Sequence, residues 1–324
     1  MLYPIIFHPI FKERVWGGRE MEKLFGKKLP PGKPIGESWE ISDRPGDESI
    51  VQNGGFAGKS LRWLMENFPR ELIGDAKTAA GKRFPLLCKI LDAREKLSLQ
   101  VHPPAAKASG MGGEPKTEMW FIAQAAPGAE LYAGLKQGVT AAEFERKISD
   151  GTVADCFHRI PVRAGDAMYL PSGRVHAIGA GLVIFEIQQN SDTTYRVFDW
   201  NRVGLDGRPR ELHIEQSLAS IDFNDFEPSL AAGKPFDNGR VKSRPLVQNP
   251  LFNVEYLEMK AGASGQLKPR KLQIVAVVGG QIKIQQSSGT LELRAGQFCL
   301  VPAILERMEI VAHSEASWLH VEAN

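Results

Sequence analysis

The sequence predicts a mainly β protein made of two sandwich or barrel units, and three observations carry this prediction. Short runs rich in β-forming residues, such as FPLLCKILDA and GLVIFEIQQ, alternate with Gly and Pro along most of the chain. Such close spacing of strands and turns is typical of sandwiches and barrels and not of βαβ sheets. The pattern Arg-Ala-Gly, five residues, Pro occurs twice, at 163–171 and 294–302. The length of 324 residues also exceeds what one ordinary core fills.

A polar linker marks the expected division between the two units. Residues 224–245, NDFEPSLAAGKPFDNGRVKSRP, are rich in Pro, Gly and polar residues. We therefore expect a first domain over 1–235 and a second, smaller β-domain over 236–324, each containing one copy of the repeated pattern.

Helices are expected only as insertions in the first domain. Segment 60–72 has apolar residues at helical spacing after Ser60, a residue that suits an N-cap. Segment 139–151 places Thr140 three residues before Glu143, which is a capping-box arrangement.

The composition excludes several classes of function. The net charge is +2, from 40 basic and 38 acidic residues, so no general attraction to nucleic acid or to a membrane surface is expected. The three cysteines are scattered and odd in number, which argues against a disulfide framework and against a thiolate zinc site. No apolar run is long enough for a membrane helix. We expect a cytoplasmic protein that binds neither nucleic acid nor membranes.

The first copy of the repeated pattern continues to a histidine. Gly165 permits a tight turn, five residues cross a strand, and Pro171 and Gly173 turn the chain back toward His176. This spacing resembles a metal-binding motif of cupin jelly-roll proteins, and we therefore expect two cupin-type jelly rolls. The second copy has Arg307 at the matching place, and a guanidinium has no lone pair for a cation. The second domain is thus expected to lack metal ligands.

Strand alternation adds three further candidate ligands. Residues two apart on a strand share a face, so Gln100 and His102 of LSLQVHPP point the same way. The same rule places Glu118 beside Lys116 in EPKTEMWFI. With His176, these side chains supply an amide oxygen, a carboxylate and two imidazoles, a set that suits one Zn²⁺ with a position open to substrate.

Two charged residues lie in the apolar and aromatic run that follows. Glu186 interrupts a strand that otherwise reads as buried, and Arg196 follows in SDTTYRVFDWNR. A charge in a buried strand is costly unless it is paired or functional. Glu186 and Arg196 are therefore either a structural ion pair or parts of an active site.

At this point the sequence resembles the type I phosphomannose isomerases, in their short bacterial form. The blocks that carry the resemblance, in the family's order, are WGG (16–18), GESWEIS (36–42), PLLCKILDA (85–93), SLQVHP (98–103), KTEMW (116–120), the Pro-Gly-His turn and SDTTYRVFDWNR (191–202). The resemblance implies a zinc ion at Gln100, His102, Glu118 and His176, and an essential arginine at Arg196. It also implies an acidic residue at Glu186, and a sugar-phosphate pocket lined by Lys89, Ser98 and Lys116.

The expected reaction interconverts mannose 6-phosphate and fructose 6-phosphate by proton transfer through an enediol. Arg196 would stabilise the developing oxyanion, and either Glu186 or Lys116 would act as the base. Lys89 and Lys116 are candidates for binding the phosphate. The protein would be a monomer or a homodimer. Two alternatives remain open at this stage: a non-catalytic sugar-binding cupin, and an Fe²⁺-dependent cupin oxygenase.

Overall fold

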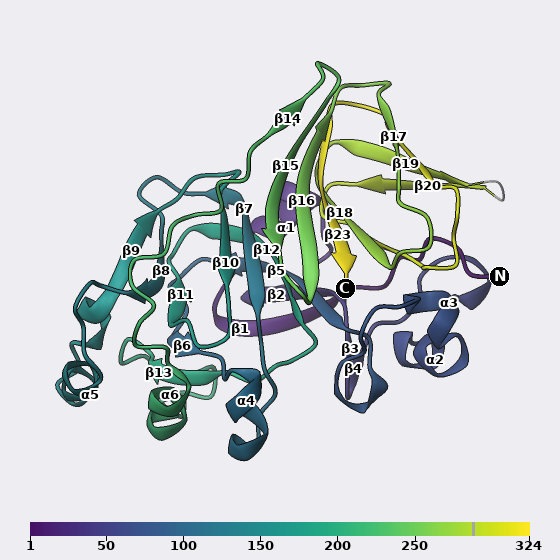
Figure 1. The fold of residues 1–324 in the computed structure, drawn as a ribbon. Coiled ribbons are helices and arrows are strands. Elements are labelled where there is room, and N and C mark those ends of the chain that lie inside the picture. The colour runs from purple at the N-terminus through teal and green to yellow at the C-terminus, as the bar shows by residue number, and fades with distance from the viewer. Residues whose placement is uncertain (287–288) are drawn as a thin grey trace.

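The computed structural model describes residues 1–286 and 289–324 and confirms the mainly β prediction (Figure 1). Residues 10–198 form two facing sheets. The larger has the order β1 (Ile10–Gly18), β2 (Ile35–Ile41), β5 (Leu86–Ala93), β12 (Leu182–Gln189), β7 (Glu118–Ala125) and β10 (Ala167–Leu170). The smaller has the order β13 (Tyr195–Phe198), β6 (Leu99–Val101), β11 (His176–Ile178), β8 (Glu130–Leu135) and β9 (Phe157–Pro161).

The last third of the chain repeats this arrangement. Its larger sheet has the order β14 (Phe236–Asp237), β15 (Val241–Gln248), β16 (Phe252–Met259), β23 (Ala316–Ala323), β18 (Gln273–Gly279) and β21 (Phe298–Val301). Its smaller sheet has the order β17 (Ser264–Gln266), β22 (Glu309–Ala312), β19 (Gln281–Gln286) and β20 (Gly289–Arg294). The two Arg-Ala-Gly patterns lead into β10 and β21, which are edge strands at matching places in the two larger sheets. The repeat in the sequence is therefore a repeat in the fold.

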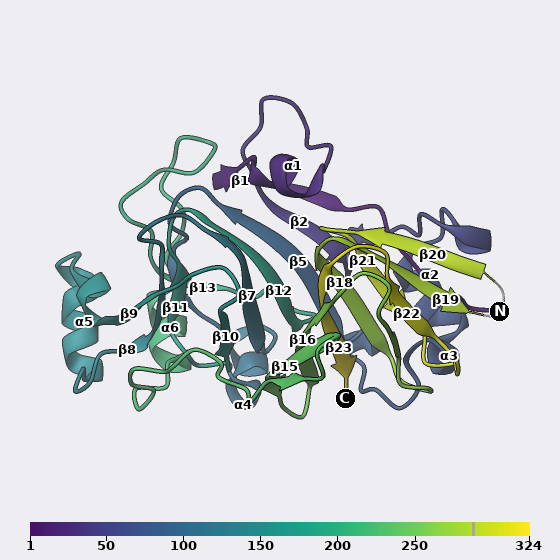
Figure 2. The ribbon, with the colours of Figure 1, turned by 90° about the horizontal axis from the view of Figure 1, so that it is seen from above.

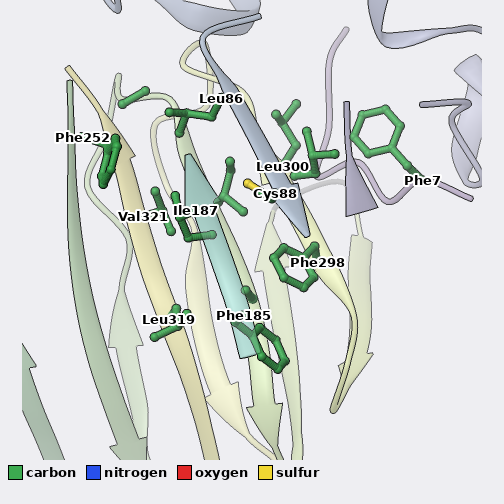
Figure 3. Packing of buried hydrophobic residues seen from close by; sticks show 14 of the residues in the cluster. Phe7, Leu86, Cys88, Phe185, Ile187, Phe252, Phe298, Leu300, Leu319 and Val321 are labelled. Atoms are coloured by element: carbon green, nitrogen blue, oxygen red, sulfur yellow. The ribbon is translucent and has the colours of Figure 1, made fainter. Parts of the chain in front are cut away.

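The four sheets form successive layers, and the two larger sheets are the middle layers (Figure 2). One continuous hydrophobic core joins these two sheets back to back. Phe185 and Ile187 of β12 face Leu319 and Val321 of β23 across this core (Figure 3). Because side chains alternate along a strand, Glu186 between them points to the opposite face, into the first sandwich.

The predicted helices are present, with one difference. Ser60 Oγ accepts a hydrogen bond from Trp63 N at 3.0 Å, and Thr140 Oγ1 accepts one from Glu143 N at 3.2 Å, so both predicted N-caps form. The second segment forms the single helix α5 (Ala141–Ser149), whereas the first is split into α2 (Leu61–Asn67) and α3 (Pro69–Ile73). The helix breaks at Phe68 because the following proline disfavours helical backbone at the residue before it.

The remaining helices and connections frame the sheets. They are α1 (Glu20–Phe25), α4 (Ala105–Ala108) and α6 (Ile214–Ser220), with a short hairpin of β3 (Asp43–Arg44) and β4 (Asp47–Glu48). Ile5 pairs with Leu300, so the first residues of the chain lie against the second unit. The division near residue 235 stays a prediction. All three cysteines are free and buried, and no helix among the described residues is long and apolar enough to span a membrane.

Candidate active site

Four side chains meet at one end of the first sandwich, between its two sheets. Gln100 lies on β6, opposite His176 at the start of β11, and both belong to the smaller sheet. Glu118 begins β7 of the larger sheet, and His102 follows β6. The ligand atoms of His102, Glu118 and His176 all lie within 4.8 Å of one another, and these three residues are buried. The structure thus brings together the four residues selected by strand alternation and by the Gly-Pro-Gly-His spacing.

Both histidines direct the same nitrogen toward Glu118. His102 Nε2 is 3.4 Å from Glu118 Oε2, and His176 Nε2 is 3.4 Å from Glu118 Oε1. Each Nδ1 faces a backbone carbonyl: Thr193 O at 2.8 Å from His102, and Arg174 O at 2.9 Å from His176. A carbonyl only accepts, so each Nδ1 carries the hydrogen and each Nε2 presents its lone pair to the centre of the cluster.

Electrostatics keep these groups in the protonation states that metal ligands need. Burial, and then the positive charge of Lys116, lower the pKa of His102 to about 3. Burial also lowers the pKa of His176. Burial raises the pKa of Glu118, but the nearby charge of Lys116 outweighs it, so the pKa of Glu118 lies well below its ordinary value. Two neutral imidazoles therefore accompany one carboxylate.

The carboxylate of Glu118 has hydrogen-bonding capacity that its neighbours leave unused. Neither oxygen makes a hydrogen bond of good geometry, although Lys116 Nζ approaches Oε2 to 2.5 Å. The amide of Gln100 lies beside His176, and its Nε2 donates a hydrogen bond to His176 Nε2 at 3.2 Å. A buried carboxylate without full hydrogen bonding is costly, whereas the same donors suit a divalent metal of borderline character. The residues present therefore fit a metal ion.

Charges of alternating sign continue from this cluster across the floor of the pocket. Beyond Lys116, the carboxylate of Glu186 accepts a hydrogen bond from Trp120 Nε1 at 2.9 Å. It also forms an ion pair with Lys89 Nζ at 3.4 Å. Lys89 Nζ lies 3.7 Å from Glu37 on β2, and Glu37 accepts a hydrogen bond from Arg14 Nε on β1 at 2.7 Å. Each buried charge thus has a neighbour of opposite sign, as burial requires.

Arg196 and Glu186 do not pair with each other, so of the two alternatives the structural ion pair between them is excluded. Arg196 lies on β13 opposite Gln100 and donates from Nη1 to Glu211 O at 2.6 Å. Its Nε is buried without a hydrogen-bond partner. Burial, and then the charge of Arg210, lower the pKa of Arg196, whereas burial raises the pKa of Glu186. Both side chains line the same pocket from opposite sheets.

The pocket has a volume of about 550 Å³ and contains every substrate-binding residue expected from the sequence. Lys89, Ser98 and Lys116 line it and are buried. Six charged lining residues were missed by the sequence analysis: Glu13, Arg14, Glu37, Asp192, Asp206 and Arg210. Glu37 and Asp192 lie within the quoted blocks GESWEIS and SDTTYR, which was the signal that pointed to them. The other four lie outside those blocks.

The second unit has different residues at the corresponding strand positions. Gln266 pairs in register with Glu309, as Gln100 does with His176. Lys268 follows two residues after Gln266, as His102 follows Gln100. Gln273 lies opposite Glu322, as Glu118 lies opposite Gln188. Glu309, and not the exposed Arg307, therefore begins the strand that matches β11.

The four residues at these matching positions, Gln266, Lys268, Gln273 and Glu309, include no histidine. The ammonium of Lys268 lies 2.5 Å from Glu322 Oε1. An ammonium has no lone pair to offer a cation. The geometry therefore favours the prediction that the second unit holds no metal.

Comparisons with known proteins agree with this geometry. Residues 5–117 match the family model described as the phosphomannose isomerase type I catalytic domain. The chain is 37% identical to a mannose-6-phosphate isomerase of Streptococcus mutans over 93% of both sequences. It is 34% identical to mannose-6-phosphate isomerase ManA of Bacillus subtilis over 98% of this chain and 99% of the relative. The crystal structure of mannose 6-phosphate isomerase from Bacillus subtilis superposes with a TM-score of 0.90 at 31% identity, covering 99% of each chain.

Proposed function

From the premise that the chain belongs to the mannose-6-phosphate isomerase family, we propose that it is a zinc-dependent aldose–ketose isomerase. It would interconvert mannose 6-phosphate and fructose 6-phosphate through an enediol. The observation that carries the zinc dependence is the buried set of two neutral imidazoles and one carboxylate, which lies next to the half-buried amide of Gln100 in the lining of a charged pocket.

Gln100, His102, Glu118 and His176 would hold a single zinc ion. Bound there, zinc would supply Lewis-acid polarisation and a template for the sugar oxygens. Zinc suits mixed nitrogen and oxygen donors. An Fe²⁺ oxygenase would use two histidines and one carboxylate with open positions, and the further donor that Gln100 adds to such a set argues against that alternative.

Glu186 is the better of the two predicted bases. Its carboxylate lines the pocket, and burial raises its pKa toward the range that proton transfer near neutral pH requires. Trp120 Nε1 and Lys89 Nζ fix the orientation of this carboxylate from two sides. Lys116, in contrast, directs its ammonium at Glu118, 2.5 Å away, and would orient that carboxylate instead of removing a proton.

Arg196 would stabilise the negative charge that develops on the enediol oxygens. Its guanidinium enters the pocket from the strand beside Gln100, and its Nε has no partner of its own. A preorganised cation in a site shielded from water stabilises a developing oxyanion strongly.

The phosphate would lie toward the mouth of the pocket. Lys89 and Lys116, the cations expected to bind it, are buried and already have carboxylate neighbours. Arg196 and Arg210 also line the pocket and are less buried. Because Arg196 is assigned to the enediol, we place the phosphate beside Arg210, whose guanidinium Asp199 holds in position through Nε and Nη2.

A coupled assay that follows fructose 6-phosphate formed from mannose 6-phosphate tests the proposal. Activity should disappear after chelation and return with stoichiometric Zn²⁺ but not with Fe²⁺. Turnover that survives complete metal removal would refute the zinc dependence. Sugar-phosphate binding without turnover in the zinc-loaded protein would instead support a binding cupin.

A further inference from the structure

We propose that Asp225 is a positioning residue for the metal centre, acting through Arg174 on His176. The inference rests on the proposed metal site and adds a pair of residues to which the sequence analysis gave no role. Neither side chain lines the pocket or reaches the ligand cluster.

Arg174 connects the ligand histidine to a distant segment. Its backbone carbonyl accepts the Nδ1 hydrogen of His176 at 2.9 Å. Its guanidinium binds Asp225 through two parallel hydrogen bonds, Nε to Oδ2 and Nη2 to Oδ1, both 2.7 Å long. A third bond runs from Nη1 to Tyr169 O at 2.7 Å. Because a two-point contact fixes the plane of the guanidinium, it also limits how the Arg174 backbone can rotate.

Asp225 itself is well anchored. Its backbone carbonyl accepts a hydrogen bond from Leu135 N at 2.9 Å, and its N–H donates to Asp222 O at 3.2 Å. The side chains of Arg174 and Asp225 are only 14% and 17% exposed, which makes the pair stronger than one in open solvent. The pair is therefore a firm link between the 222–226 segment and the turn that precedes His176.

The same turn is also tied to the other ligand histidine. Gly173 N donates to the backbone carbonyl of His102 at 2.9 Å, and Asp222 N donates to Gly173 O at 2.9 Å. Gly173 has φ +94°, a left-handed conformation that favours glycine. The 222–226 segment thus holds the turn by backbone at Gly173 and by side chain at Arg174, and the turn in turn contacts the imidazole of His176 and the backbone of His102.

Loss of the Asp225 charge should weaken metal binding without removing any ligand. Residues that orient ligands from outside the coordination sphere typically change metal affinity by about 10–100-fold. Asp225 acts one step further out, so we expect about a tenfold rise in the zinc dissociation constant for Asp225→Asn.

The test compares metal binding in four proteins. Wild type, Asp225→Asn, and the double variant Arg174→Met with Asp225→Asn are measured for zinc dissociation constant, zinc release rate and the absorption spectrum of the Co²⁺-loaded form. The double variant leaves no unpaired buried charge, so it keeps the test available if the single variant folds poorly. Glu130→Gln is the matched control, because Glu130 makes a two-point contact with Arg159 in the same small sheet.

The expected result is weaker zinc binding, faster release and a changed Co²⁺ spectrum in both Asp225 variants, with Glu130→Gln like wild type. Lower melting temperatures with unchanged zinc affinity and spectrum would overturn the inference, since they would show a structural role alone. If wild type bound no metal, the proposed function would fail instead, and the two failures are therefore distinguishable.

Discussion

Replacing Glu37 by Gln tests whether the paired charges under the pocket stabilise the fold. The substitution keeps the shape of the side chain and removes its charge. In the native protein the carboxylate accepts hydrogen bonds from Arg14 Nε at 2.7 Å and from Trp39 Nε1 at 2.6 Å, with Lys89 Nζ at 3.7 Å. The variant therefore leaves two cations without their shared counter-charge.

The size of the effect follows from the pKa of Glu37. Burial raises this pKa, but the charges of Lys89 and Arg14 outweigh burial and lower the pKa from 4.5 to about 2. At about 1.4 kcal/mol for each tenfold change in proton affinity, this corresponds to about 3 kcal/mol of stability at neutral pH. Because the folded-state pKa lies below the ordinary value, this stabilisation is present above about pH 4.5 and is lost as the pH falls toward about 2.

Urea unfolding of both proteins from about pH 7 down to about pH 3 measures the difference directly. We expect the variant to be less stable by about 3 kcal/mol at neutral pH, with the gap narrowing in acid as the wild-type carboxylate gains its proton. Glu130→Gln, whose partner Arg159 is largely exposed, should cost less than about 1 kcal/mol. A gap for Glu37→Gln that is the same at every pH would refute the argument, because shape and not charge would then explain it.

Further substitutions separate the roles of the two units and of the shared core. His176→Ala should abolish zinc binding and isomerase activity together, whereas Arg307→Ala, at an exposed position, should leave both nearly unchanged. Metal analysis and the coupled assay measure the two properties. Loss of zinc from the Arg307 variant would contradict this prediction. Phe185→Ala should lower the free energy of unfolding by about 3–5 kcal/mol. The reason is that the ring is fully buried and stacks on the ring of Phe298, with 5.4 Å between the two ring centroids. Denaturant unfolding measures this loss, and a cost below about 1 kcal/mol would show that the interface between the two large sheets contributes little.

Local pattern was sufficient to identify the proposed ligands. Alternation correctly placed Gln100 and His102 on one face of β6, because the neighbouring Leu99 and Val101 pack on the other face. The same alternation placed Glu186 on the opposite face of β12 from Phe185 and Ile187, which belong to the hydrophobic core. A strand has only two faces, so a period of two in the sequence fixes which side chains share one.

Local pattern could not show which strands become neighbours. Arg14 and Glu37 reach the pocket because β1 and β2 join the edge of the large sheet beside β5, whose other neighbour is the distant strand β12. The contact between Arg174 and Asp225 spans 51 residues and closes only when the first sandwich is complete. Such pairings depend on tertiary packing, and strand periodicity carries no information about them.

Residue spacing also placed the counterpart of His176 at Arg307, whereas strand register places it at Glu309. The turn after Pro302 is two residues longer than the turn after Pro171 before the matching strand begins. Counting residues from a shared proline assumes equal turns, and turns are where insertions are tolerated best.

The absence of the ligand set from the second unit is consistent with its position in the molecule. Strands β5, β12 and β7 have charged residues on the face toward the pocket, where Lys89, Glu186 and Glu118 lie, and apolar residues on the other face. That apolar face would be open to water without the large sheet of the second unit, which covers it through Leu319, Val321 and their neighbours. A one-residue slip of any of these strands would exchange the charged face for the apolar one, so the packing that buries one face also fixes the register of the other. The second unit can therefore support the first by burying its apolar face and fixing the register of its strands.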